Sequence, residues 1–138
     1  MTFIASMARL NPLAWLALRD PWRIVSHQLS AVIATRPDLD DSPEYLIGIL
    51  RSAALAAELT PMGHTSVRFQ PCGSSAVVLL AESHIAAHHW PEHHKMTVDI
   101  HICDYRRDNL SSAQRAAKSI EKAVATKTPT WRLRSIAG

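Results

Sequence analysis

The stretch KMTVDIHIC, at residues 95–103, alternates strictly between polar and apolar side chains. Successive side chains of a strand point to opposite faces of a sheet, so this period of two predicts a strand with one apolar face. The run SAVVLLAE, at residues 75–82, is nearly all apolar, as is typical of a buried strand. A single strand cannot bury an apolar face, so the chain has to form a sheet with a cover over that face.

The rest of the sequence supplies further strands and the cover. Strands are predicted over residues 23–34, 64–71 and 130–137, and helices over residues 42–59 and 110–127. The short links between neighbouring strands favour antiparallel pairing. This order of elements predicts an α+β two-layer sandwich, in which an antiparallel sheet carries both helices on one face. The other face also needs cover, so we expect a homodimer in which two sheets face each other in an αββα arrangement.

Composition limits the class of protein. With 138 residues, 47% of them hydrophobic and 20% charged, the chain fits one globular domain with a core. The net charge is +3 and the basic residues are scattered, so we expect no nucleic-acid partner. Cys72 and Cys103 are too few for a disulfide scaffold, and we see no export signal. We therefore expect free thiols in the reducing cytoplasm.

Residues 1–22 form an apolar N-terminal extension ahead of the domain at residues 23–138. Arg9, Pro12 and Arg19 interrupt it, so no run reaches the roughly 18 apolar residues that a spanning helix needs. The segment also lacks the ordered regions of a signal peptide. We expect no membrane span, and a short helix that docks on the domain rather than one that lies on a membrane surface.

The segment AESHIAAHHWPEHH, at residues 81–94, holds five of the eight histidines. A metal site is one interpretation, but on a strand His88 and His89 would point to opposite faces. The sequence also contains no Cys-x-x-Cys pair, so we expect no metal. A serine hydrolase is another interpretation, but no G-x-S-x-G motif surrounds Ser83. Taken singly, a buried serine or histidine is most simply a hydrogen-bonded core residue.

A resemblance gives these residues a joint role. The block AESHIAAHHWPE, the preceding RFQPCGSS and the following DIHIC resemble the pattern of the small prokaryotic S-adenosylmethionine decarboxylases. That family consists of pyruvoyl-dependent lyases of polyamine and spermidine biosynthesis, made as zymogens. The likeness runs without a gap from Arg68 to Cys103 and more loosely from His27 to the C-terminus, and residues 1–22 lie outside it.

The resemblance implies that the chain cleaves itself. Ser83 would attack the carbonyl of Glu82, Ser75 would hold that carbonyl, and His88 would remove the Cα proton of residue 83. Ser83 would become a pyruvoyl group, so neither pyridoxal phosphate nor a metal would be needed. The two products would be residues 1–82 and residues 83–138.

The resemblance also implies how the substrate is bound and converted. The pyruvoyl group would form a Schiff base with the α-amine of the substrate, and carbon dioxide would leave. Cys103 would be the proton donor, because a thiol with an ordinary pKa of about 8.5 is largely protonated near neutral pH. Phe69 and Trp90 would stack on the adenine, Glu92 would accept hydrogen bonds from the ribose, and Ile85 would form an apolar wall. Some of these contacts would come from the partner subunit.

Departures from the family pattern bear on the substrate. Ala31 stands four residues after His27, where the family has an acid near the amino-acid end of the substrate, and Cys72 replaces a common histidine. Further histidines have no counterpart in the pattern: His89, His93, His94 and His101. The pyruvoyl machinery stays intact, but two alternatives remain open. They are the same chemistry on arginine or ornithine, and an inactive homologue that keeps only the fold.

Overall fold

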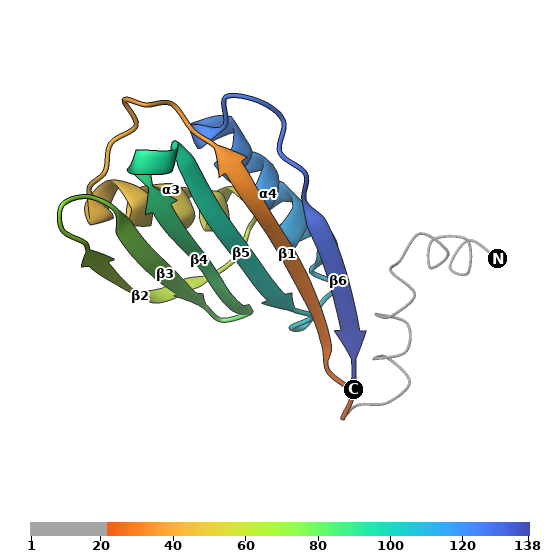
Figure 1. Cartoon of the computed structure of the whole chain (residues 1–138). Coiled ribbons are helices and arrows are strands. Elements are labelled where there is room, and N and C mark those ends of the chain that lie inside the picture. Colours follow the sequence, from red (N-terminus) through yellow and green to blue (C-terminus); the bar gives the residue numbers. More distant parts are fainter. Residues whose placement is uncertain (1–21) are drawn as a thin grey trace.

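The computed structural model describes residues 22–138 and shows a six-stranded sheet with two α-helices on one face (Figure 1). The elements are β1 (Val25–Ala34), α3 (Pro43–Ala56), β2 (Pro61–Arg68), β3 (Ser74–Leu80), β4 (Ser83–Trp90), η1 (Pro91–His93), β5 (Lys95–Cys103), α4 (Leu110–Val124) and β6 (Arg132–Ala137). Neighbouring strands all pair antiparallel, in the order β2-β3-β4-β5-β1-β6. The predicted α+β sandwich with both helices on one face is confirmed.

The N-terminal extension expected over residues 1–22 lies outside the described residues, apart from Trp22, so its docking stays a prediction. Among residues 22–138 the structure has no helix that is long and apolar enough to span a membrane.

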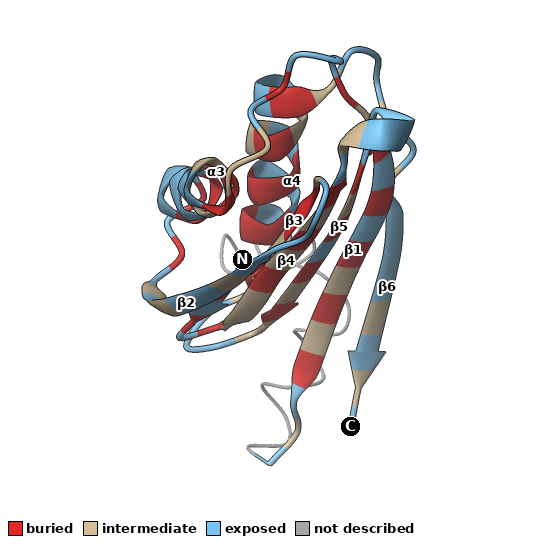
Figure 2. Cartoon of the chain, turned by 60° about the vertical axis from the view of Figure 1, so that its left-hand side comes forward, coloured by how far each residue is buried: buried red, intermediate tan, exposed pale blue. Residues whose placement is uncertain are grey.

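The core lies between the sheet and the two helices. Figure 2 shows the buried residues as red bands that alternate along the strands, and the red faces of the helices turn toward the sheet. In β5 the inward side chains are at most 1% exposed: Met96, Val98, Ile100 and Ile102. Leu50 of α3 and Ile120 of α4 pack on this side and are fully buried. The alternation in residues 95–103 therefore arises as predicted, because one face of β5 packs against the core and the other does not.

Strand β4 is the element that the sequence pattern does not predict. The histidine-rich segment forms a complete strand between β3 and β5, and the 3-10 turn η1 follows it. Ile85, Ala87 and His89 point into the core, whereas His84 and His88 point to the other face. Imidazole occurs on either face of a sheet, so the period of two is not visible in the sequence. The sheet therefore has six strands, of which β4 is the one added to the five ranges predicted from the sequence.

The face of the sheet opposite the helices, called the open face below, has no cover among the described residues. It carries small polar and histidine side chains together with exposed apolar ones. The large apolar side chains on it include Val32, Val67, Leu79 and Trp90, which are 46% to 61% exposed. A second sheet packed on this face would bury them, and the expected homodimer stays a prediction.

Candidate active site

The expected cleavage site lies in a tight turn between β3 and β4. Ala81 and Glu82 form the turn, and Ser83 pairs with Leu80 as the first residue of β4. Ser83 has a φ of +147°, which residues other than glycine rarely adopt. The backbone N–H of Cys103 donates a 2.8 Å hydrogen bond to the carbonyl oxygen of Glu82. The peptide bond between Glu82 and Ser83 is therefore next to a strained residue, and its carbonyl is polarised.

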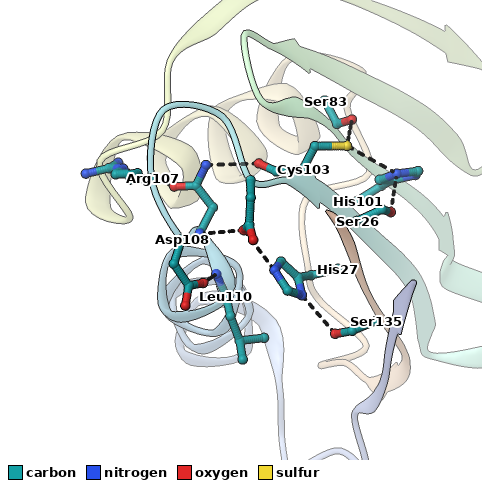
Figure 3. A network of polar contacts seen from close by, with 11 residues as sticks. Ser26, His27, Ser83, His101, Cys103, Arg107, Asp108, Leu110 and Ser135 are labelled. Carbon is teal, nitrogen blue, oxygen red and sulfur yellow. Dashed lines mark hydrogen bonds and ion pairs between the residues drawn. The ribbon is translucent and has the colours of Figure 1, made fainter. Parts of the chain in front are cut away.

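Cys103, the last residue of β5, also brings its side chain to this turn. Its Sγ lies 3.5 Å from Ser83 Oγ and 3.9 Å from His101 Nε2 (Figure 3). The same imidazole nitrogen makes a 2.8 Å hydrogen bond with Ser26 Oγ. The structure brings Ser83 and Cys103 together, as the sequence predicts, and it adds His101 and Ser26, to which the sequence gives no role in the site. The alternation of β5 does place His101 on the same face as Cys103, and that signal is readable in the sequence.

His84 of β4 lies beside this group, with its ring centroid 5.2 Å from that of His101. Partial burial lowers the pKa of His84 and the neighbouring His101 lowers it further, while Asp99 acts in the opposite direction. A lowered pKa favours neutral imidazole at neutral pH, so His84 offers a hydrogen-bonding group rather than a positive charge.

A second cluster of expected site residues lies at the other end of β4. Ser75 Oγ and His88 Nδ1 are 2.7 Å apart. They border a small pocket of about 60 Å³, whose other lining residues are Phe69, Cys72, Gly73, His89, Trp90 and Glu92. The side chains of Phe69 and Trp90 are 50% and 46% exposed, so their rings are free to stack on a planar ligand.

Glu92 is a charged hydrogen-bond acceptor in this cluster. Its own backbone N–H, and then the Cys72 thiol at 3.3 Å from Oε2, lower the pKa of Glu92. The same hydrogen bond raises the pKa of the Cys72 thiol. An ionised carboxylate has the lone pairs to accept two hydroxyl groups. Cys72, a departure from the family pattern, therefore supports Glu92.

The loop between β2 and β3 carries Phe69 and is held by Asp41. Both carboxylate oxygens of Asp41 accept the Gly73 N–H, at 3.1 and 3.0 Å, and Oδ1 lies 3.6 Å from His89 Nδ1. Gly73 has a φ of +99°, and a Cβ there would lie 3.2 Å from the carbonyl oxygen of His89, so glycine is required. His89 is 4% exposed, and burial lowers its pKa although Asp41 raises it. His89 is thus part of the framework.

The two clusters lie at opposite ends of the same strand. Ser83 and His88 are five residues apart in the sequence, which is roughly 16 Å at about 3.3 Å per residue. The register agrees, because Ser83 pairs with Leu80 at one end of β3 and His88 pairs with Ser75 near the other. Within one chain, Ser75 and His88 therefore do not reach the bond between Glu82 and Ser83.

Two further positions face the core. Ile85, which the sequence analysis assigns to the substrate pocket, is fully buried on the helix side of β4, so the structure gives no support for that contact. Ala31 also faces the helices and is 8% exposed. The absence of a carboxylate at position 31 therefore does not change the open face. That face does carry a carboxylate at Asp99, which accepts a 2.6 Å hydrogen bond from Ser30.

His27 stabilises the end of β5. It is fully buried, with Nε2 at 2.9 Å from Asp104 Oδ1 and Nδ1 at 2.8 Å from Ser135 Oγ (Figure 3). Asn109 donates its N–H to Asp104 at 2.8 Å and its side-chain amide to the carbonyl of Cys103 at 2.9 Å. Among residues 22–138, one group of possible metal ligands has its ligand atoms within 4.8 Å of one another: His27, Asp104 and Asp108. Because the imidazole and the Asp104 carboxylate bond each other, we assign this group to the framework.

The fold and the first cluster together indicate a class of protein. A pyruvoyl-dependent decarboxylase is expected to have a strained serine in a hairpin turn, with a hydrogen-bonded carbonyl before the serine and a thiol beside it.

Comparison with known proteins identifies the family. The sequence pattern of the S-adenosylmethionine decarboxylase family matches residues 27–133. The S-adenosylmethionine decarboxylase proenzyme of Hydrogenobaculum sp. is 40% identical over 77 residues, which are 56% of this chain and 58% of that protein. The proenzyme of Aquifex aeolicus is 38% identical over 103 residues, 71% of this chain and 76% of that protein. The crystal structure of the adenosylmethionine decarboxylase from Aquifex aeolicus matches with a TM-score of 0.70 and 33% identity, over 80% of this chain and 88% of that chain.

The chain belongs to the S-adenosylmethionine decarboxylase family. This confirms the family that the sequence pattern resembles, and the named relatives are decarboxylase proenzymes. The matches favour S-adenosylmethionine over the alternatives of arginine and ornithine. The matched region, residues 27–133, contains both clusters of the candidate active site except for Ser26.

Proposed function

We propose that the chain is the proenzyme of a pyruvoyl-dependent decarboxylase that acts on S-adenosylmethionine and forms the aminopropyl donor of spermidine biosynthesis. The observation that carries the proposal is the turn at Glu82 and Ser83, where a strained serine follows a carbonyl hydrogen-bonded to Cys103 N–H. The names of the relatives support it. Self-cleavage in this turn would divide the chain, and with it the domain at residues 23–138, into residues 1–82 and residues 83–138.

The turn supplies the groups for the first step of cleavage. Ser83 Oγ forms a bond to the carbonyl carbon of Glu82, the amide C–N bond breaks, and the nitrogen takes the hydroxyl proton. The N–H of Cys103 lies where negative charge develops on the oxygen and stabilises it. A base then removes the Cα proton of residue 83, the Glu82 carboxylate leaves, and water releases ammonia.

Cys103 has a second task in the cleaved enzyme. The pyruvoyl group formed at residue 83 supplies an electron-accepting carbonyl for decarboxylation, a role that needs neither pyridoxal phosphate nor a metal. The Cys103 thiol lies 3.5 Å from Ser83 Oγ. It can therefore donate a proton to the substrate carbon that has lost carbon dioxide. Both Cys72 and Cys103 are free thiols. A thiol acid has to stay reduced, and we place the enzyme in the reducing cytoplasm.

A second copy of the chain would complete the active site. Ser75 and His88 lie at one end of the open face, and Ser83 and Cys103 lie at the other. A two-fold axis between facing sheets would bring each end of one chain against the opposite end of its partner and form two identical sites. His88 of the partner subunit would then be the base at residue 83. The exposed apolar side chains of the open face support this dimer, because a second sheet would bury them.

The side chains around the small pocket beside His88 offer contacts for a nucleoside. Phe69 and Trp90 offer two exposed rings for adenine, and the ionised Glu92 offers two oxygens for the ribose hydroxyls. The test is carbon dioxide release by the cleaved enzyme from carboxyl-labelled S-adenosylmethionine, arginine and ornithine. We expect release from S-adenosylmethionine alone. Release from arginine or ornithine instead, or from none of the three, would overturn the proposed substrate.

Glu92→Gln tests the nucleoside contact directly. The substitution removes one acceptor and the charge, so we expect KM for S-adenosylmethionine to rise about tenfold or more while kcat changes little. Glu44→Gln is the matched control, because Glu44 is exposed in the first turn of α3, away from both clusters. Equal KM values for the two variants would exclude a ribose contact at Glu92.

A further inference from the structure

Thr60, the residue before β2, makes three hydrogen bonds to the cleavage turn. Its backbone N–H and its hydroxyl donate to the two carboxylate oxygens of Glu82, at 3.1 and 3.0 Å. Its carbonyl accepts the N–H of Ala81 at 2.9 Å. Both residues of the turn are therefore held by one neighbouring residue that the sequence analysis does not include.

The Glu82 carboxylate depends on these bonds. Glu82 is 6% exposed, and a buried carboxylate is costly unless hydrogen bonds replace the lost water. Among residues 22–138 no ion pair involves Glu82, and its side-chain hydrogen bonds both come from Thr60. The position of the Glu82 side chain is thus set by Thr60.

Arg107 links the loop before Thr60 to the segment that follows β5. Its Nη2 donates to the carbonyl of Glu58 at 2.7 Å, in the loop that ends at Thr60. Its Nε donates to Asn109 Oδ1 at 3.0 Å, and Asn109 in turn holds the carbonyl of Cys103 (Figure 3). The loop that holds the Glu82 side chain and the strand end that holds the Glu82 carbonyl therefore share one anchor.

We propose that Thr60 is a positioning residue for self-cleavage, and this inference rests on the proposed function. Attack of Ser83 Oγ on the Glu82 carbonyl carbon requires a defined distance and direction of approach. Thr60 holds the side chain of Glu82 while Cys103 N–H holds its carbonyl oxygen, so rotation of the Glu82 carbonyl would break hydrogen bonds. The step itself needs no further reactant, because the O–C bond forms, the C–N bond breaks, and the hydroxyl proton passes to the nitrogen.

The test compares cleavage rates of full-length chains made by cell-free synthesis and sampled over time on denaturing gels. Thr60→Val removes one hydrogen bond to a charged group, and we expect cleavage to slow about tenfold or more. Thr60→Ser keeps the hydroxyl and should cleave within about threefold of the wild type. Thr126→Val is the control for the substitution itself, because it removes the hydroxyl of another exposed threonine, which donates to the backbone carbonyl of Ala34 at 3.2 Å.

A purely structural role for Thr60 is distinguished by stability. In an uncleavable Ser83→Ala background, we expect both Thr60→Val and Thr126→Val to stay fully folded at the temperature of the cleavage assay, although only Thr60→Val slows cleavage in the native background. If Thr60→Val does not fold, Thr60→Ala removes the same hydroxyl without adding bulk and should show the same slowing.

The outcomes separate the inference from the proposed function. An uncleaved wild-type chain would overturn both. A cleaved wild type with Thr60→Val or Thr60→Ala cleaving equally fast would overturn the role of Thr60 alone. Slow cleavage in Thr60→Ser as well as in Thr60→Val would also overturn it, because the hydroxyl would then not be the group that matters.

Discussion

At residue 83, a serine has two properties that a purely structural serine does not need. Its φ of +147° is a conformation that glycine adopts far more readily, and its hydroxyl lies 3.5 Å from a thiol. Residues in such rare conformations cost about 1–3 kcal/mol each and persist where the surrounding structure imposes them. Cleavage between Glu82 and Ser83 would release this strain, so the strain favours the proposed reaction.

The variant Cys103→Ala separates the two tasks of this cysteine. The backbone N–H that bonds the Glu82 carbonyl remains, so we expect self-cleavage to continue. The thiol proton is lost, and turnover by the cleaved enzyme should fall about a hundredfold or more, as for other lost general acids. Intact mass measures cleavage and carbon dioxide release measures turnover. Unchanged turnover in fully cleaved Cys103→Ala would exclude the thiol as the proton donor.

The proposed reacting residues are identified in the sequence by its resemblance to the family pattern, but the residues that support them are not. Glu82, Ser83 and Cys103 all lie in the segments that carry this resemblance. Thr60 and Ser26 reach the same place only because β2 pairs with β3 and β1 pairs with β5 in particular registers. The register between strands that are distant in the sequence is set by the packed sheet and leaves no local pattern.

Among the elements, β4 shows why one strand could not be predicted. Its three histidines lie on both faces: His89 is buried, whereas His84 and His88 are partly exposed. Without a visible period of two, the sequence does not show which face of the sheet Ile85 occupies, and the structure places its side chain in the core. The other elements have clear periods and lie within a few residues of the predicted ranges.

The loop between β2 and β3 offers a prediction about an element. Gly73→Ala places a side chain at a φ of +99° and a Cβ 3.2 Å from the carbonyl oxygen of His89. We expect a loss of about 1–3 kcal/mol in the free energy of unfolding and a higher KM, because this loop carries Phe69. Gly48→Ala in α3 is the control, since its Cβ meets nothing within 4 Å, and it should be neutral or stabilising by up to about 1 kcal/mol. Chemical denaturation and substrate kinetics measure both effects, and a neutral Gly73→Ala would contradict this view of the loop.

On the scale of the whole molecule, the account requires two chains for one active site. Ser83→Ala and His88→Ala should each leave the chain uncleaved when expressed alone. When they are expressed together, a mixed dimer contains one site with an intact Ser83 from one chain and an intact His88 from the other. We therefore expect the His88→Ala chain, and not the Ser83→Ala chain, to be cleaved in the mixture. No cleavage in a mixture shown to contain mixed dimers would exclude a site shared between subunits.

Self-cleavage between Glu82 and Ser83 is tested most directly by the intact mass of the purified protein under denaturing conditions. We expect two fragments, residues 1–82 and residues 83–138, with the second lighter by one ammonia than its sequence with serine. Ser83→Ala should give one uncut chain. A single uncut chain from the wild type would contradict the account and would favour an inactive homologue that keeps only the fold.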